Sequence, residues 1–348
     1  MKWMKKTISA LLLTVLLIAG SSLPVLADDM VTLTGQQITK HFVMAEGLEV
    51  PTTTFYFTAT AVTEDAPVVT IGSISYDTTD TLGSLSAEGT YTLDKNADII
   101  FGTFPHAGTY KYTVTEIADN ADGITYDNRS YTMLVYVANN IEGILTIQSI
   151  TVEADTGKQD TLSFTNTYRR NGSLRVTKKT NGDLADKTKD FAFTITFMKS
   201  GTESDNATSY TGKIGEETVI CAIGNETTFY LHNGECLVFE TLPVGTRYVV
   251  TEKAARDGYS PSVDIIENNI QGVTRTASDA DALSTADAGS SNLVGENENS
   301  VTYTNTYDTI PVTGLLLYIL PFLLLIVFPA LALILPAVIK TCKKRRKH

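Results

Sequence analysis

Ser163–Tyr168 reads Ser-Phe-Thr-Asn-Thr-Tyr, and Thr302–Tyr307 reads Thr-Tyr-Thr-Asn-Thr-Tyr. Both copies alternate small polar residues with aromatic or amide side chains, which predicts strands that carry Asn166 and Asn305 between aromatic residues on one face. A buried amide costs free energy unless it finds a hydrogen-bond partner. The repeat therefore predicts that each asparagine meets a specific polar group inside a β-fold.

Short segments of alternating side chains fill the rest of the chain. They are rich in Thr, Val, Tyr and Phe, they are separated by Gly, Asp, Asn and Pro, and outside the two termini they show no convincing helical period. This texture predicts an all-β chain built from antiparallel β-sandwiches. The expected strands are 54–60, 108–116, 130–137 and 143–152 in the first half and 174–178, 191–197, 227–231, 235–240 and 247–252 in the second.

The two asparagine strands each close one half of the chain. We therefore expect an N-terminal domain over 28–170 and a C-terminal domain over 171–308, with a hinge at Arg169–Gly172. The stretch 274–300 is rich in Ser, Ala, Asp and Asn, which predicts a long mobile loop before the last strand.

Both ends of the chain have the composition of export and anchoring signals. Residues 1–27 combine three lysines, an apolar run and a final Val-Leu-Ala, which predicts a signal peptide cleaved before Asp28. Residues 315–339 are 25 residues without a charge, long enough to cross a bilayer as a helix. The six basic residues within 340–348 predict a cytoplasmic tail.

The charge balance excludes some classes of partner. The two ends hold nine of the 27 basic residues and none of the 39 acidic ones, so the part between them carries 18 − 39 = −21 formal charges. Such an acidic surface argues against binding nucleic acid or anionic lipid. The sequence has no metal-ligand cluster, no nucleophile motif and only four histidines. We therefore expect no metal, no cofactor and no enzyme with turnover.

Cysteines are too few to stabilise the exported part. Cys342 lies in the predicted tail, which leaves Cys221 and Cys236. Spacing alone does not decide whether these two form a disulfide in an oxidising compartment. If the domains are unusually stable, another device is responsible.

Two further landmarks recur at nearly the spacing of the asparagine strands, which is 305 − 166 = 139. Tyr112–Glu116 reads Tyr-Thr-Val-Thr-Glu and Tyr248–Glu252 reads Tyr-Val-Val-Thr-Glu, an offset of 252 − 116 = 136. Lys40 and Lys178, each on the apolar face of an early strand, are 178 − 40 = 138 apart, and apolar alternation favours Lys178 over Lys179. Two homologous domains explain all three offsets.

Each half thus offers one lysine, one glutamate and one asparagine on apolar strand faces. Desolvation lowers the pKa of a buried lysine and raises that of a glutamate beside it, so the pair can exist as a neutral amine and a protonated acid. The amine is then a nucleophile for the asparagine carboxamide, while the acid polarises the amide oxygen and passes protons to the departing ammonia. The predicted products are the isopeptide bonds Lys40–Asn166, with Glu116 as catalyst, and Lys178–Asn305, with Glu252 as catalyst. The alternative is an ordinary salt bridge beside a hydrogen-bonded asparagine.

This paired pattern resembles the isopeptide-linkage domains of Gram-positive backbone pilins, especially the two-domain streptococcal type. The second half also carries Thr241–Gly245 (Thr-Leu-Pro-Val-Gly) before its glutamate strand, as collagen-adhesin B-type domains do. The resemblance covers Asp28 to the C-terminus. It implies two tandem immunoglobulin-like β-sandwiches in which lysine and asparagine form the bond and glutamate catalyses it.

Ile310, Pro311, Val312, Thr313 and Gly314 stand directly before the apolar span. They resemble the sortase sorting signal, usually Leu-Pro-x-Thr-Gly. The resemblance implies a membrane-bound cysteine transpeptidase that cuts between Thr313 and Gly314 and holds the Thr313 acyl group as a thioester. Isoleucine in the first place leaves the class of sortase open. The alternative is a plain single-pass anchor.

A polymer would need a lysine of a neighbouring subunit to attack that thioester. Lys158, eight residues before Asn166, lies close to the place of the polymerising lysine in the streptococcal family. The alternative is an ordinary solvated loop lysine.

These features predict a cell-wall-linked surface protein of a Gram-positive bacterium, and specifically the shaft subunit of a sortase-assembled pilus. Its expected partners are a sortase, identical subunits, ancillary pilins and peptidoglycan. The alternative is an adhesin or minor pilin that is anchored singly, binds a host receptor and needs no acceptor lysine.

Overall fold

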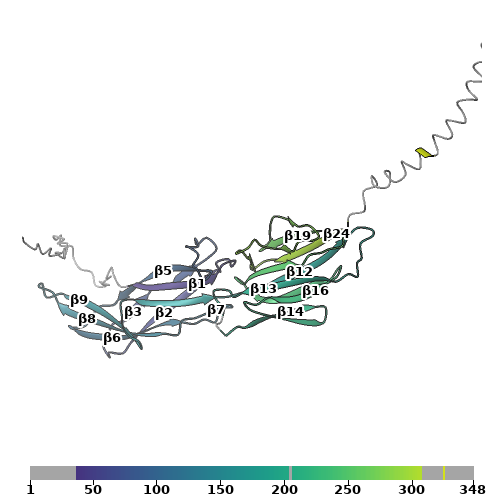
Figure 1. Cartoon of the computed structure of the whole chain (residues 1–348). Helices are drawn as coiled ribbons and strands as arrows, with labels where there is room; N and C mark the ends of the chain where they lie inside the picture. The colour runs from purple at the N-terminus through teal and green to yellow at the C-terminus, as the bar shows by residue number, and fades with distance from the viewer. Residues whose placement is uncertain (1–36, 204–205, 308–323, 326–348) are drawn as a thin grey trace, which may run out of the picture.

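The computed structural model describes residues 37–203, 206–307 and 324–325. Over 37–307 its regular elements are β-strands, arranged as two β-sandwiches that lie end to end (Figure 1). The prediction of an all-β chain with two tandem sandwiches is therefore confirmed. The described residues contain no helix long and apolar enough to cross a bilayer. The predicted segments 1–27, 310–314 and 340–348 lie outside the described residues, as does 315–339 apart from 324–325.

The N-terminal sandwich packs a five-stranded sheet against a six-stranded one. Its strands are β1 (Gln37–Ala45), β2 (Thr53–Ala61), β3 (Val69–Ile71), β4 (Ile74–Tyr76), β5 (Thr90–Phe101), β6 (Gly108–Ile117), β7 (Ile124–Thr125), β8 (Ser130–Asn139), β9 (Leu145–Ala154), β10 (Gly157–Gln159) and β11 (Leu162–Tyr168). The sheet orders are β3-β5-β1-β11-β7 and β10-β9-β8-β6-β2-β4. Turns at 122–123 and 142–143 place Gly123 and Gly143 at positive φ, which glycine adopts without strain.

The C-terminal sandwich has the same two-layer design. Its strands are β12 (Asn171–Asn181), β13 (Phe191–Met198), β14 (Ser209–Ile214), β15 (Glu217–Ala222), β16 (Thr227–Leu231), β17 (Cys236–Pro243), β18 (Arg247–Glu252), β19 (Tyr259–Glu267), β20 (Ile270–Gln271), β21 (Arg275–Thr276), β22 (Leu283–Ser284), β23 (Asn292–Leu293) and β24 (Ser300–Tyr307). One sheet runs β15-β14-β17-β12-β24-β19-β20, with β21 beside β19, and the other runs β16-β13-β18-β22, with β23 beside β18.

In each domain the first strand lies parallel beside the last. β1 pairs with β11, with Lys40 opposite Phe164, and β12 pairs with β24, with Lys178 opposite Tyr303. In both pairs the asparagine comes two residues after the residue opposite the lysine. The identical register is what a duplicated domain produces.

Two apolar cores fill the sandwiches, and apart from Val244 the division between them falls between Tyr168 and Leu174. The strand alternation predicted from the sequence is what supplies them. In β8, for example, Tyr131, Met133 and Val135 are buried while the residues between them are not.

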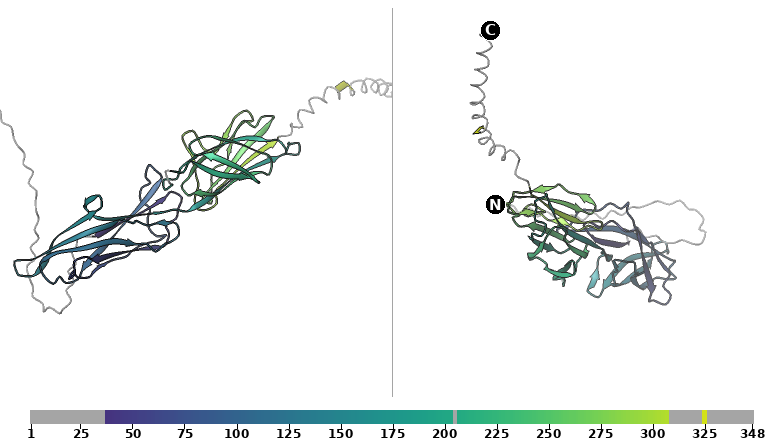
Figure 2. Two further views of the ribbon diagram at one scale, coloured as in Figure 1. Left: turned by 90° about the horizontal axis from the view of Figure 1, so that it is seen from below. Right: turned by 90° about the vertical axis from the view of Figure 1, so that its right-hand side faces the viewer.

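The junction between the domains is packed, although we expected a hinge at Arg169–Gly172. The Arg169 N–H donates to the Gly123 carbonyl oxygen at 2.8 Å, and the Arg170 carbonyl oxygen accepts from the Val244 N–H at 2.9 Å. Val244 itself belongs to the core of the N-terminal sandwich. The two sandwiches therefore form an elongated body without an open linker between them (Figure 2).

The prediction of a mobile loop over 274–300 is wrong. This segment contributes β21, β22 and β23, and Leu283 and Val294 are buried in the core. The Thr285 hydroxyl accepts a hydrogen bond from the Val250 N–H at 3.0 Å. A few widely spaced apolar residues tie down a segment whose composition is mostly polar.

The sheet order explains why the two cysteines of the C-terminal sandwich do not form a disulfide. Cys221 on β15 and Cys236 on β17 are both free, because β14 lies between their strands. Arg175 donates to the Cys236 sulfur at 2.9 Å. Within the described residues the sandwiches are not joined by a disulfide.

Candidate functional site

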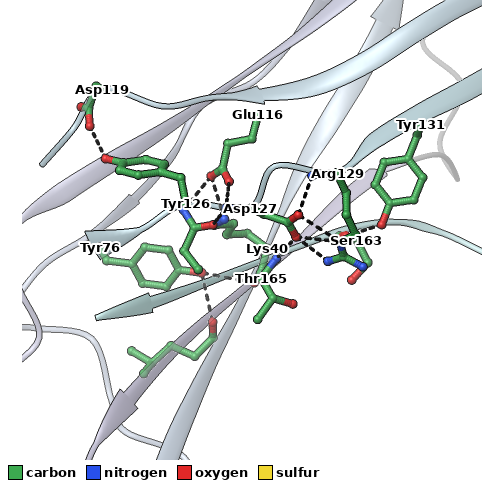
Figure 3. A network of polar contacts seen from close by, with 12 residues as sticks. Lys40, Tyr76, Glu116, Asp119, Tyr126, Asp127, Arg129, Tyr131, Ser163 and Thr165 are labelled. Carbon is green, nitrogen blue, oxygen red and sulfur yellow. Dashed lines mark hydrogen bonds and ion pairs between the residues drawn. The ribbon is translucent and has the colours of Figure 1, made fainter. Parts of the chain in front are cut away.

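The first buried polar set lies between the two sheets of the N-terminal sandwich. Lys40 Nζ donates to Glu116 Oε1 at 2.7 Å, and Asn166 Nδ2 donates to the same oxygen at 2.9 Å. The Lys40 and Glu116 side chains are fully buried. The structure thus brings together the three residues that the sequence assigned to this domain. Figure 3 shows Lys40 and Glu116 of this set.

The second set repeats the arrangement in the C-terminal sandwich. Lys178 Nζ donates to Glu252 Oε1 at 2.8 Å, and Asn305 Nδ2 donates to that oxygen at 2.7 Å. All three residues are buried, whereas the neighbouring Lys179 is exposed. Lys178 is therefore the buried lysine of this strand.

Topology explains why residues so far apart in sequence meet. In each domain the lysine is on the first strand, the asparagine is on the parallel last strand, and the glutamate projects from the opposite sheet, on β6 or β18. The first and last strands can meet because the rest of the domain forms the crossover that a parallel pair requires. A Lys–Asn bond at this place would join the two ends of the domain.

Two phenylalanines that are not among the predicted site residues cover the lysines. Lys40 Nζ lies 4.6 Å from the centre of the Phe55 ring, and Lys178 Nζ lies 4.2 Å from that of Phe191. Each ring is two residues before the strand partner of the glutamate. The Phe-x-Phe repeat, at the glutamate offset of 191 − 55 = 136, was the signal that could have identified them.

Burial shifts both ionisable partners toward their neutral forms. Desolvation lowers the pKa of Lys40 and of Lys178 from 10.5 to about 8, although the adjacent carboxylates oppose it. Desolvation likewise raises the pKa of Glu116 and Glu252 above the ordinary value, against the effect of the lysines. A neutral amine beside a protonated acid is therefore accessible near neutral pH.

The glutamate oxygen is placed for proton transfer between two nitrogens. Because Glu116 Oε1 contacts both Lys40 Nζ and Asn166 Nδ2, it can accept a proton from the attacking amine and deliver it to the departing amide nitrogen. This differs from the expectation that the acid polarises the amide oxygen. The Asn166 Oδ1 atom instead accepts from the Asp127 backbone N–H at 2.8 Å, which can only donate and so fixes the orientation of the amide.

Lys158, the predicted acceptor for a neighbouring subunit, is exposed. It lies on β10, the edge strand of the six-stranded sheet, with Glu153 as its partner residue on β9. It lies on a surface strand, so a second chain can approach it without unfolding the domain.

One cluster of metal-ligand types was not anticipated. Single ligand atoms of Asp190, His232 and Glu235 lie within 4.8 Å of one another at the surface of the C-terminal sandwich. Glu235 accepts from the His232 backbone N–H at 3.1 Å and is 2.8 Å from the ring Nδ1. These contacts between His232 and Glu235 account for the cluster.

In the Asn166→Ala variant, the stability of the N-terminal sandwich should depend on the titration of Lys40. It leaves Lys40 as a free buried amine, whose pKa is about 8 in the folded domain and 10.5 in the unfolded chain. Between these values the unfolded chain binds more protons, so stability should increase as pH rises from 8 to 10.5, by about 3 kcal/mol. Urea unfolding across this range measures the gain.

The control for this titration is the double variant Lys40→Met with Asn166→Ala, which has no amine at the site. Its stability should not show the part of the increase between pH 8 and 10.5 that Lys40 causes. An equal gain in both variants would show that other groups cause it.

Two sequence families match the chain. Residues 36–169 match the FctA family, described as the Spy0128-like isopeptide containing domain. Residues 172–307 match a domain of unknown function (DUF7601). Only the first of these descriptions mentions an isopeptide.

Relatives with longer matches are pilus proteins. A pilin of Streptococcus pyogenes serotype M1 is 27% identical over 243 residues, which are 66% of this chain and 68% of the pilin. The pilus tip adhesin Cpa of Streptococcus pyogenes is 34% identical over 142 residues, 41% of this chain but only 18% of the adhesin. The solved major pilin T3.2 of Streptococcus pyogenes is 24% identical and covers 78% of this chain and 98% of its own, with a TM-score of 0.38. Residues 36–169 thus match the family described as the Spy0128-like isopeptide containing domain, and the chain is similar to a streptococcal pilin over 66% of its length.

Proposed function

We propose that this chain is a structural pilus subunit whose two domains are each braced by a self-formed Lys–Asn isopeptide bond. One observation carries the proposal: in both domains a single buried glutamate oxygen contacts the lysine amine and the asparagine amide nitrogen. The similarity to a streptococcal pilin supports the structural role.

The reaction in the first domain uses only the chain's own groups. Lys40 Nζ attacks Asn166 Cγ, and the new C–N bond forms as the bond from Cγ to Nδ2 breaks. The protonated Glu116 carboxyl group gives its proton to Nδ2, which leaves as ammonia, and takes a proton back from Nζ. Glu116 ends in its starting state, while the lysine and asparagine are consumed. Lys178, Glu252 and Asn305 repeat these steps in the second domain, so each site reacts once.

Intact mass spectrometry of the exported part, residues 28–313, tests this chemistry. We expect the wild-type mass to fall short of the sequence mass by two molecules of ammonia. Glu116→Ala should restore one ammonia and Glu252→Ala the other, because each substitution removes one proton carrier.

Lys179→Ala is the matched control for Lys178→Ala. Removing the exposed Lys179 should leave both ammonia losses intact, whereas removing the buried Lys178 should prevent one of them. A wild-type mass equal to the sequence mass would end the proposal of isopeptide bonds.

Assembly into a shaft is the second part of the proposal. A sortase would cleave between Thr313 and Gly314, and the Thr313 acyl group would pass to Lys158 of the next identical subunit or, at the base, to peptidoglycan. Asn305 would then join the last strand to the first strand five residues before Ile310. Tension that arrives through Thr313 would load a covalent bond instead of a ladder of hydrogen bonds.

A singly anchored adhesin or minor pilin is the second candidate. The 34% identity with a pilus tip adhesin over 142 residues favours it. Such a protein would use the same sorting motif, but it would require no acceptor lysine. The two candidates differ in whether the chain forms a high-mass polymer.

A further inference from the structure

The segment from Tyr126 to Arg129, between β7 and β8, lies over the first triad. The Asp127 backbone N–H points at the asparagine carboxamide: it donates to Asn166 Oδ1 at 2.8 Å and lies 3.3 Å from Glu116 Oε2. The Asp127 N–H thus contacts the carbonyl oxygen of the carboxamide, while the nitrogen that leaves contacts Glu116.

The Asp127 side chain holds this N–H in place. Its Oδ2 accepts from the Thr165 N–H at 2.7 Å, one residue before Asn166 on β11. Its Oδ1 accepts from the Arg129 N–H at 2.9 Å, and the carboxylate also pairs with the Arg129 guanidinium (Figure 3). The carboxyl group is only 5% exposed. A charge-assisted network around this buried carboxylate fixes both the 126–129 segment and the strand that carries Asn166.

We infer that Asp127 is a positioning residue for the first isopeptide bond and that its backbone N–H forms the oxyanion site of the reaction. The inference rests on the function proposed above. When Lys40 Nζ adds to Asn166 Cγ, the electron pair of the C=O bond moves to Oδ1, where the Asp127 N–H already donates. The negative charge is stabilised there until the bond from Cγ to Nδ2 breaks and ammonia leaves. A donor fixed before the reaction lowers the barrier most, because no reorganisation is needed.

The described part of the second domain has no such donor at its asparagine. Asn305 Oδ1 and Glu252 Oε2 are buried and have no hydrogen-bond partner among the described residues. The lysine and the glutamate are arranged alike in the two domains, so the main difference between the sites is the donor at the amide oxygen. We therefore expect the first bond to form faster than the second.

The rate of ammonia loss tests the inference. The full chain is synthesised in a cell-free system with detergent, samples are quenched in acidic denaturant at intervals, and intact masses are read. In the Glu252→Ala background only the first domain reacts. There Asp127→Ala should slow the loss by about 10-fold or more, since removing an oxyanion donor outright costs about 10²–10³-fold. Asp122→Ala, an exposed change nearby, should leave the rate unchanged.

A rescue variant distinguishes positioning from folding. Asp127→Asn keeps an oxygen that accepts from the Thr165 N–H, and it should recover most of the wild-type rate. Equal slowing by Asp127→Asn and Asp127→Ala would contradict the inference. So would a wild-type rate in Asp127→Ala, or a second domain that links as fast as the first.

A further measurement does not depend on any variant of Asp127. Amide hydrogen exchange at Asp127 should be slow in Lys40→Met, which cannot form the bond but keeps the acceptor oxygen, and at least about 10-fold faster in Lys40→Met with Asn166→Ala, which lacks that oxygen. Unchanged exchange would overturn the inference. If the wild type loses no ammonia at all, the proposed function fails; if it loses two while Asp127→Ala links at the normal rate, only the role of Asp127 fails.

Discussion

Asn166→Ala is expected to lower the unfolding temperature of the N-terminal sandwich by roughly 15 °C. The Lys40–Asn166 bond would close a loop of roughly 125 residues, and by the chain-entropy model such closure stabilises the domain by about 4–5 kcal/mol. Glu116→Ala should cost more, because it also leaves Lys40 buried without its carboxylate partner. Scanning calorimetry of residues 28–313 measures both changes.

The second domain is the internal control for this experiment. Asn166→Ala should leave the transition of the C-terminal sandwich close to its wild-type temperature, and Asn305→Ala should reverse the pattern. If Asn166→Ala shifted the first transition by only a degree or two, the bond would not be the main brace of that domain.

Lys158→Ala is expected to abolish the high-mass ladder of the shaft in immunoblots of cell-wall extracts. The reason is chemical: without the amine, the Thr313 acyl-enzyme has no partner on the neighbouring subunit. Lys158 is exposed on the edge strand β10, so its loss should leave the fold and both ammonia losses intact. Lys111→Ala, at an exposed lysine of the same six-stranded sheet, is the matched control and should keep the ladder.

The same blot separates the two candidate functions. A wild-type extract with a single anchored band would identify a singly attached adhesin or minor pilin. A ladder that persists in Lys158→Ala would keep the shaft role and assign another lysine as the acceptor. Thr313→Ala should remove wall attachment in either case.

The triads could be predicted because strand alternation assigns faces. A lysine, a glutamate or an asparagine at an apolar position breaks the pattern. Because all three recur at an offset of 136–139 residues, chance does not explain them. The same alternation placed Lys178 inside and Lys179 outside, as the structure has them. Phe55 and Phe191 were not predicted as site residues for the opposite reason. An aromatic residue on an apolar face fits the pattern, so nothing distinguishes it from any other core residue.

Other features left no trace in the local sequence. Asp127 and Arg129 stand in an ordinary polar turn, and their importance follows from Thr165 and Asn166, which are distant in sequence and reach them only in the folded domain. The stretch 274–300 has the composition of a loop, yet Leu283 anchors it in the core. Composition averages over a segment, whereas packing depends on a few side chains.

The sequence by itself determined the all-β fold, its two sandwiches and the identity of the six residues in the two triads, because each depends on a side-chain pattern of period two. Only the tertiary structure decided which atoms meet. The parallel register of the first and last strands places each amine and amide at one glutamate oxygen. Among the described residues, a backbone N–H reaches the amide oxygen in the first domain and not in the second. Backbone donors are the same in every residue, so their positions follow from the fold and cannot be read from residue types.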